Sequence, residues 1–229
     1  MKNTIKEVNT IMDLRKHLEF FNPDIEENIH IIGLGAIGSH VAIMLTRLGL
    51  NNIHIYDFDN VNKHNIANQH YFEADIGFSK TVCTQEYMEN VCCNVEIVPY
   101  DDGYIKQNLN GYVFLCVDDI ELRKEIVEEN RHNKQIKAMF DFRMRLTDAQ
   151  AYAANWSDPT SIIRLLKTMS FTKEEAKEAT PLSACGTTLA VLPTIWCIVS
   201  LGIANFINFT KGGHIKEFTM FDTFHQTLY

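Results

Sequence analysis

The sequence of 229 residues lacks the features that mark a secreted protein. Its first residues contain no apolar signal core, which a secretory precursor would carry. No two of its six cysteines stand in a CxxC motif, and nothing in the chain indicates an oxidising compartment. We therefore expect a cytoplasmic protein whose thiols are reduced.

Basic residues are also in the minority, with 21 Lys and Arg against 29 Asp and Glu, which gives a net charge of −8. Because binding to phosphate backbones needs a basic surface, this balance disfavours a nucleic-acid partner. We find no internal repeat, low-complexity tract or domain linker. The length and the 46% hydrophobic content are typical of one α/β domain over residues 1–229.

Charge is absent altogether from residues 189–209. Such a stretch is long enough to cross a bilayer. However, Pro193 and Asn205 interrupt it, its ends show no clear excess of Lys or Arg, and a buried helix can be apolar on all sides. We predict a helix in the core or at a subunit interface, and no membrane.

What the chain does contain is a run over residues 28–57 that is typical of nucleotide binding. An apolar stretch leads into Gly33, Gly35 and Gly38, a helical pattern follows, and a second apolar stretch ends at Asp57. Gly33 allows a tight turn, Gly35 lets a phosphate approach the backbone, and Gly38 lets the helix pack on the strand. Amides at the helix start would face the anion, and Asp57 would accept bonds from a ribose. The alternative is a glycine turn without a ligand.

Two further charged positions also point to phosphate. Lys80 opens a predicted helix, where a cation is unfavourable unless an anion lies nearby. Asp118 and Asp119 follow a predicted buried strand over 111–117, and a carboxylate at such a strand end is a typical ligand of Mg²⁺. The alternative for the two acids is the N-cap of a helix over 119–130.

The remaining apolar patterns predict a Rossmann-like, doubly wound α/β fold. We expect a helical lead-in over 1–27 and a nucleotide-binding core over 28–130. Residues 131–229 would add a sheet extension, a crossover loop and the apolar helix. The sheet is expected to be mainly parallel, with an antiparallel C-terminal extension.

The order of several short motifs resembles the ThiF/MoeB family, the ubiquitin-activating-enzyme-like adenylyltransferases. The motifs are GxGxxGS from Gly33, the strand end Asp57-x-Asp59, Asn65 with Gln69, Asp75-Ile76-Gly77-x-x-Lys80, and Asp118-Asp119 with Arg123. The match runs from about Ile29 to Arg123, with a weaker similarity around Cys185 and the apolar helix. Each motif alone is common, whereas their order is specific.

The resemblance implies that the core binds ATP and adenylates the C-terminal carboxylate of a small ubiquitin-like or sulfur-carrier protein, or of a peptide, with release of pyrophosphate. The residues that would bind the nucleotide are Gly33, Gly35, Ala36, Ile37, Gly38, Asp57, Asp59, Asn65, Lys80 and Asp118. Within this set, Asn65 and Lys80 would contact phosphates, and Asp118 would hold Mg²⁺. Members are commonly homodimers, so we expect a homodimer here.

The chain departs from the family pattern in ways that affect the predicted chemistry. Asn68 stands where the family usually has an arginine, and we hypothesise that Arg143, Arg145 or a partner subunit's Arg15 replaces that cation. The paired CxxC motifs that hold zinc in many members are absent, so no zinc is expected. Cys185 is a candidate acceptor of the activated acyl group, with a buried unreactive thiol as the alternative.

Three other functions stay open at this point. An NAD-dependent oxidoreductase could use the same cradle, although Lys80 and Asp118 suit a triphosphate with a metal better. A nucleotide-binding protein without catalysis is favoured by Asn68. The RNA-modifying branch of the family is disfavoured by the net charge of −8.

Overall fold

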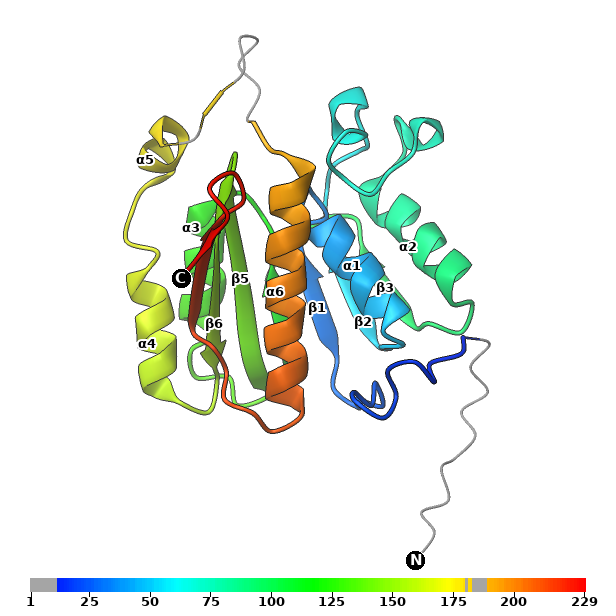
Figure 1. Cartoon of the computed structure of the whole chain (residues 1–229), viewed down its shortest axis with the longest axis horizontal. Coiled ribbons are helices and arrows are strands. Elements are labelled where there is room, and N and C mark those ends of the chain that lie inside the picture. Colours follow the sequence, from blue (N-terminus) through cyan, green and yellow to red (C-terminus); the bar gives the residue numbers. More distant parts are fainter. Residues whose placement is uncertain (1–11, 180, 183–188) are drawn as a thin grey trace, which may run out of the picture.

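The computed structural model describes residues 12–179, 181–182 and 189–229, which form one sheet with helices on both faces (Figure 1). The sheet has the strand order β3-β2-β1-β4-β5-β6-β7-β8. The strands are β1 (Ile29–Ile32), β2 (Ile53–Tyr56), β3 (Ile97–Tyr100), β4 (Gly111–Leu115), β5 (Ile136–Arg145), β6 (Asp148–Asn155), β7 (Phe218–Asp222) and β8 (Thr227–Leu228). The α-helices are α1 (Gly38–Arg47), α2 (Lys80–Val91), α3 (Ile120–Asn130), α4 (Pro159–Lys167), α5 (Lys173–Glu178) and α6 (Leu192–Thr210).

The first five strands pair in parallel, and β6, β7 and β8 extend the sheet in antiparallel fashion. The predicted fold class is therefore confirmed. Parallel neighbours need a crossover between them, and α1, α2 and α3 supply three of these connections. As a result, the carboxyl ends of β1, β2 and β4 meet at the same end of the sheet.

The two edges of the sheet differ from its centre. β3 is one edge, and it carries Pro99 opposite Ile55 of β2. β8 is the other edge and contains only Thr227 and Leu228. The central strand β4 is buried along its whole length, as expected of a strand covered on both faces.

Two hydrophobic clusters fill the space between the sheet and its helices. One unites residues of α1 and α6 with one face of the sheet, and Ile31, Phe140 and Phe206 are examples. The other lies under α3 and α4, with Ile126 and Trp156 among its members. Covering of both faces by helices is the arrangement that defines a doubly wound sheet.

The uncharged stretch over 189–209 corresponds to α6, which begins later than predicted because Pro193 occupies its first turn. By length and composition alone this helix could span a membrane. Of the apolar 18-residue stretch that meets this criterion, 39% is buried inside the protein. It lies along β5 and β6 beside α1 (Figure 1). The contact with β5 is close, since a Cβ at Gly202 would lie 2.2 Å from the ring of Phe142. This position supports the prediction of a helix in the core or at a subunit interface.

The helical lead-in predicted over 1–27 does not form in its described part. Residues 1–11 lie outside the described residues, and residues 15–20 form turns rather than a helix. The apolar pattern there does not build a buried face, because Leu18, which fits the helical spacing, is 39% exposed. Pro23 follows closely and disfavours helix in the residue before it.

A stack of aromatic rings lies across β1, β2 and β3. The imidazole of His30 is 1% exposed, its ring centre lies 4.6 Å from that of His54, and its Nδ1 shares a 2.8 Å hydrogen bond with the hydroxyl of Tyr56. Tyr56 stacks in turn on Tyr100. Burial, with a contribution from His54, lowers the pKa of His30 to about 4. His30 is therefore neutral in the folded protein at pH 7.

We expect the free energy of unfolding to fall by about 2 kcal/mol between pH 7.5 and pH 5 because of His30. The folded pKa of about 4 lies below the unfolded value of 6.5, so the unfolded chain binds the proton first as the pH drops through this window. Urea unfolding at both pH values would measure the loss. His30→Gln should make the loss smaller by about 2 kcal/mol, and His64→Gln, at an exposed position, should leave it unchanged. Equal losses in all three proteins would contradict the assignment.

Candidate nucleotide site

The loop between β1 and α1 contains the three glycines of the predicted cradle. Gly33 has a φ of +94°, which side chains other than glycine rarely adopt. A Cβ at Gly38 would lie 1.8 Å from the carbonyl oxygen of Gly33, so the helix can approach only without one. A Cβ at Gly35 would meet nothing within 4 Å. Gly35 therefore faces open space at the start of α1.

The same loop leads into the N-terminus of α1 without a side-chain cap. Ile37 occupies the N-cap position, and its apolar side chain is buried. Ala36 precedes it and is half-buried. Because an uncapped helix start favours negative charge, an anion next to Gly35 would be stabilised there.

Asp57 holds the glycine loop to the end of β2. Its Oδ2 accepts a 2.6 Å hydrogen bond from the backbone N–H of Leu34, and its Oδ1 accepts one of 2.9 Å from the N–H of Asp59. Burial raises the pKa of this carboxyl despite the opposing effects of Lys80 and the two amides. The acid that the sequence assigns to a ribose thus also fixes the shape of the cradle.

Lys80 is 6% exposed and reaches back from the start of α2 to the two acids after β2. Its Nζ lies 2.8 Å from Oδ2 of Asp59 and 3.8 Å from Oδ1 of Asp57. The negative charge that we expected at the first turn of this helix is therefore supplied by two carboxylates within the chain. They hold the ammonium group beside the cradle.

Asn65 lies in the polar insert after β2, within the short 3-10 helix Lys63–Asn65. It is 4% exposed, its Oδ1 accepts from the N–H of Asn62, and its carbonyl accepts from the N–H of Asn68 and Gln69. The side chain and the carbonyl of Asn65 thus fix the turn that leads into Asn68 and Gln69. This is a structural role that the motif alone did not reveal.

Near the start of α1, four buried polar atoms have no hydrogen-bond partner among the residues that the structure describes. They are Nε2 of His40, Oδ1 of Asn68, Oε1 of Gln69 and Nε2 of His70. The segment that carries three of them is fixed to α1, because the N–H of His70 donates to Oγ of Ser39. Buried polar groups in native proteins are normally paired, so such a cluster is typical of a place that receives a ligand or water.

The two acids after β4 have different environments. Asp119 is the N-cap of α3, where its Oδ1 accepts from the N–H of Glu121 and Leu122, and its Oδ2 lies 2.5 Å from Nζ of Lys173. The N-cap interpretation is therefore right for Asp119. Asp118 is exposed and makes no hydrogen bond or ion pair with the described residues, which leaves its oxygens available.

A magnesium ion fits these residues. Within residues 12–179, 181–182 and 189–229, no three His, Cys, Asp or Glu side chains come together as a metal site. Mg²⁺ needs no such group, since it is commonly held by one or two carboxylates together with substrate phosphates and water. Asp118 is the available carboxylate at this end of the sheet.

Arg123 lies in the first turn of α3 and is 5% exposed. Its guanidinium donates to the carbonyl oxygens of Leu115 and Val117 and to the carboxylate of Asp141. It therefore supports the backbone that carries Asp118. These contacts orient the backbone rather than reach into the space open to a ligand.

The candidate replacements for the family arginine are all tied to acids elsewhere. Arg143 pairs with Asp141 at 2.5 Å, Arg145 pairs with Asp148 across the β5–β6 turn, and Arg15 pairs with Asp13 ahead of β1. Arg143 is linked to the candidate site, because its partner Asp141 also contacts Arg123. Cys185 lies outside the described residues.

Sequence reasoning missed Asp141 altogether. This acid lies in the middle of β5, is 0% exposed, and contacts both Arg123 and Arg143. A signal was present, because a single acid in a buried apolar strand requires a cationic or hydrogen-bonding partner. Arg143, two residues later on the same face of the strand, was an identifiable partner, whereas the pairing with Arg123 of another element could not be found without the fold.

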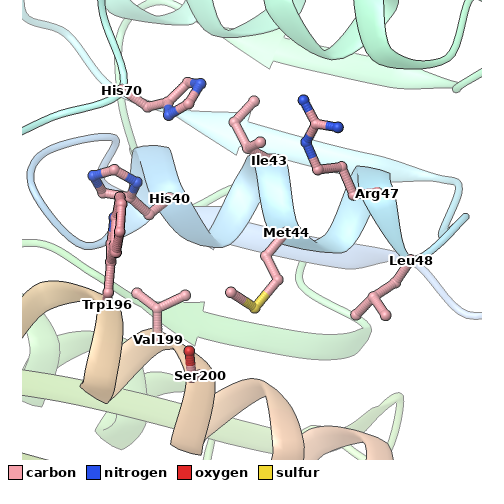
Figure 2. A pocket seen from close by; sticks show the side chains of 9 residues that line it. All are labelled: His40, Ile43, Met44, Arg47, Leu48, His70, Trp196, Val199 and Ser200. Carbon is pink, nitrogen blue, oxygen red and sulfur yellow. The ribbon is translucent and has the colours of Figure 1, made fainter.

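A groove of about 380 Å³ lies between α1 and α6 beside the glycine loop (Figure 2). It is lined by His40, Ile43, Met44, Arg47, Leu48, His70, Trp196, Val199 and Ser200. The rings of His40 and His70 meet edge to face, with centres 5.4 Å apart. Burial lowers the pKa of His40 to about 4, so this end of the groove is uncharged at pH 7.

The chain is similar to one known protein family and to several curated proteins. The model of the ThiF family matches residues 25–226. One similar relative is tRNA threonylcarbamoyladenosine dehydratase 1 of Saccharomyces cerevisiae, which is 30% identical over 121 residues, or 48% of this chain and 28% of that protein. Another is ubiquitin-like modifier-activating enzyme 5 of Dictyostelium discoideum, which is 35% identical over 117 residues, or 43% of this chain and 31% of that protein.

A solved structure of E. coli MccB with AMPCPP and MccA has a similar fold. It aligns with 89% of this chain and 62% of its own length, with a TM-score of 0.64 and 15% sequence identity. At this identity the likeness shows the fold alone. The chain spans less than a third of the two curated relatives and less than two thirds of the MccB chain.

Proposed function

Because the chain belongs to the ThiF family, we propose that it is an ATP-dependent adenylyltransferase. Its substrate would be the C-terminal carboxylate of a small ubiquitin-like or sulfur-carrier protein, or of a peptide. The observation that carries this proposal is the open space at Gly35 together with the buried ammonium group of Lys80, which is linked to the glycine loop through Asp57. A phosphate chain needs such a combination of accessible backbone and fixed positive charge.

In the proposed reaction, a carboxylate oxygen of the substrate attacks the α-phosphorus of ATP. The bond from this phosphorus to the bridging oxygen breaks, and pyrophosphate leaves with the electron pair, so that an acyl-adenylate forms. Lys80 and the helix start at Gly38 would stabilise the charge on the phosphates, and Asn65 would present Asn68 and Gln69 to them. Magnesium bound at Asp118 would neutralise part of the phosphate charge.

The same residues distinguish between the alternative functions. Asp118, unpaired among the described residues, and Lys80 favour a triphosphate with a metal over NAD. Asn68, which brings no charge, keeps a non-catalytic nucleotide-binding protein as the main alternative. A role in tRNA modification is favoured by the relatives that carry this name, whereas the net charge of −8 opposes it.

A homodimer is the oligomeric state that we propose, in the cytoplasm. The exposed side of α6 is uncharged and includes Trp196, which is 56% exposed, as well as Cys197 and Ser200. It borders the groove of Figure 2. An uncharged, partly apolar helix face suits an isologous contact, in which the same surface meets itself. Sedimentation of the full chain would measure the state.

ATP–pyrophosphate exchange is the direct test of adenylation. We expect exchange that requires Mg²⁺ and a carrier protein or peptide with a free C-terminus, and that is not supported by the same carrier with an amidated C-terminus. Exchange supported by tRNA instead would favour the RNA-modifying alternative. Thermal stabilisation by ATP without exchange, for every carrier and for tRNA, would indicate the non-catalytic protein and contradict the proposal.

A further inference from the structure

A buried arginine–aspartate–arginine cluster lies behind the loop that carries Asp118. Its members are Arg123 of α3 and Asp141 and Arg143 of β5. Asp141 is fully buried, and the two arginines bind different oxygens of its carboxylate. Buried charges are costly unless they are paired in good geometry, so this cluster is fixed in place.

One end of the cluster reaches the candidate site through the backbone. Arg123 donates to the carbonyl oxygens of Leu115 and Val117, the latter being the residue directly before Asp118. The direction in which Asp118 leaves the strand end therefore depends on where Arg123 is held. Asp141 holds it through Oδ1.

The other end of the cluster reaches the segment that leads to α5. Nη1 and Nη2 of Arg143 donate to the carbonyl and hydroxyl oxygens of Thr168, at 2.7 Å and 2.9 Å. The guanidinium also lies over the rings of Tyr152 and Phe171. Arg143 thus has bidentate, stacked contacts that a lysine could not reproduce.

The same segment returns to the acids after β4. Phe171 is followed closely by Lys173, which pairs with Asp119 at 2.5 Å. Asp118 is therefore flanked on one side by a carbonyl that Arg123 holds and on the other by an acid that Lys173 holds. The contacts therefore form a continuous path from Asp141 through Arg143 and the segment of Phe171 and Lys173 to Asp119.

We propose that Asp141 and Arg143 are positioning residues, which fix the carboxylate of Asp118 for the magnesium ion of bound ATP. The inference rests on the proposed function, because it concerns the same nucleotide. Groups that orient a metal-binding carboxylate typically change affinity when they are lost, although they do not touch the metal.

Arg143→Gln is the variant of choice, because Asp141 keeps its ion pair with Arg123 and no buried charge is left alone. Calorimetric titration should show an affinity for ATP with Mg²⁺ that is about tenfold lower than in the wild type. The affinity for ATP in the presence of EDTA should not change. Arg143→Lys should recover only part of the lost affinity, since lysine restores the charge but not the planar group that binds through two nitrogens.

Two comparisons separate positioning from a general structural effect. Arg164 of α4 also binds a carboxylate, that of Glu217, through two nitrogens. Arg164→Gln should leave the affinities for ATP with Mg²⁺ and with EDTA unchanged. Combined with Asp118→Asn, Arg143→Gln should cause no further loss, because its effect passes through Asp118. Equal losses with and without Mg²⁺, or losses that add to that of Asp118→Asn, would overturn the positioning role.

The wild type distinguishes failure of this inference from failure of the proposed function. If the wild type binds ATP equally with and without Mg²⁺, the metal role of Asp118 is wrong, and the positioning role falls with it. If the wild type shows a magnesium effect that disappears in Asp118→Asn but survives in Arg143→Gln, only the positioning role is overturned.

Discussion

Lys80→Met is expected to lower the rate of ATP–pyrophosphate exchange by about 10²–10³-fold, the usual effect of removing one fixed group that stabilises transition-state charge. Nζ of Lys80 is held by Asp59 and Asp57 within a side chain that is 7% exposed. Its position is therefore set before the nucleotide arrives. Methionine keeps the apolar stem of the side chain but removes the charge.

Lys106→Met provides a matched control. Lys106 also contacts two carboxylates, those of Glu125 and Glu129, but its side chain is 63% exposed. This variant should keep the wild-type rate. Urea unfolding of Lys80→Met is needed alongside, because Asp57 loses its nearest cation. A folded Lys80→Met protein that retains more than a tenth of the exchange rate would contradict the role of Lys80.

Gly35→Val and Gly38→Ala are expected to fail in opposite ways. A Cβ at Gly35 would meet no atom of the described residues within 4 Å, so the free energy of unfolding should change by less than about 1 kcal/mol. The added atoms would instead occupy the space where a phosphate approaches the backbone, and ATP affinity should fall by about 10²-fold.

Gly38→Ala should destabilise the fold instead, by more than about 3 kcal/mol, because its Cβ would lie 1.8 Å from the carbonyl oxygen of Gly33. Urea unfolding and ATP titration of both variants would separate the two roles. A stable Gly38→Ala protein, or a Gly35→Val protein with normal ATP affinity, would contradict this division between packing and binding.

The sequence predicts the parallel half of the sheet well, because local signals coincide there. Apolar strands, glycines with fixed spacing and the acid at position 57 all indicate the same unit, and the structure contains it. The lead-in was predicted wrongly for its described part, because helical spacing does not show whether a face is buried. Phe20 and Phe21 are adjacent and have opposite environments.

The sequence could identify candidate site residues only where a motif specifies the residue at one position. Gly35, Lys80 and Asp118 all lie at the carboxyl end of the sheet, as parallel topology requires. The pairing of Lys80 with Asp59 and the cluster around Asp141 depend on side chains that come from different elements. Residue type and spacing do not contain this information, because the contacts arise from tertiary packing.

The edges of the sheet have a consequence for the protein in concentrated solution. An open strand edge can recruit the edge of another molecule and so start fibre-like aggregation. In β3, Pro99 removes one of the backbone amides that such pairing would need. β8 consists of two residues and offers little length for an additional strand. The protein therefore resists growth of its sheet from one molecule to the next at both edges.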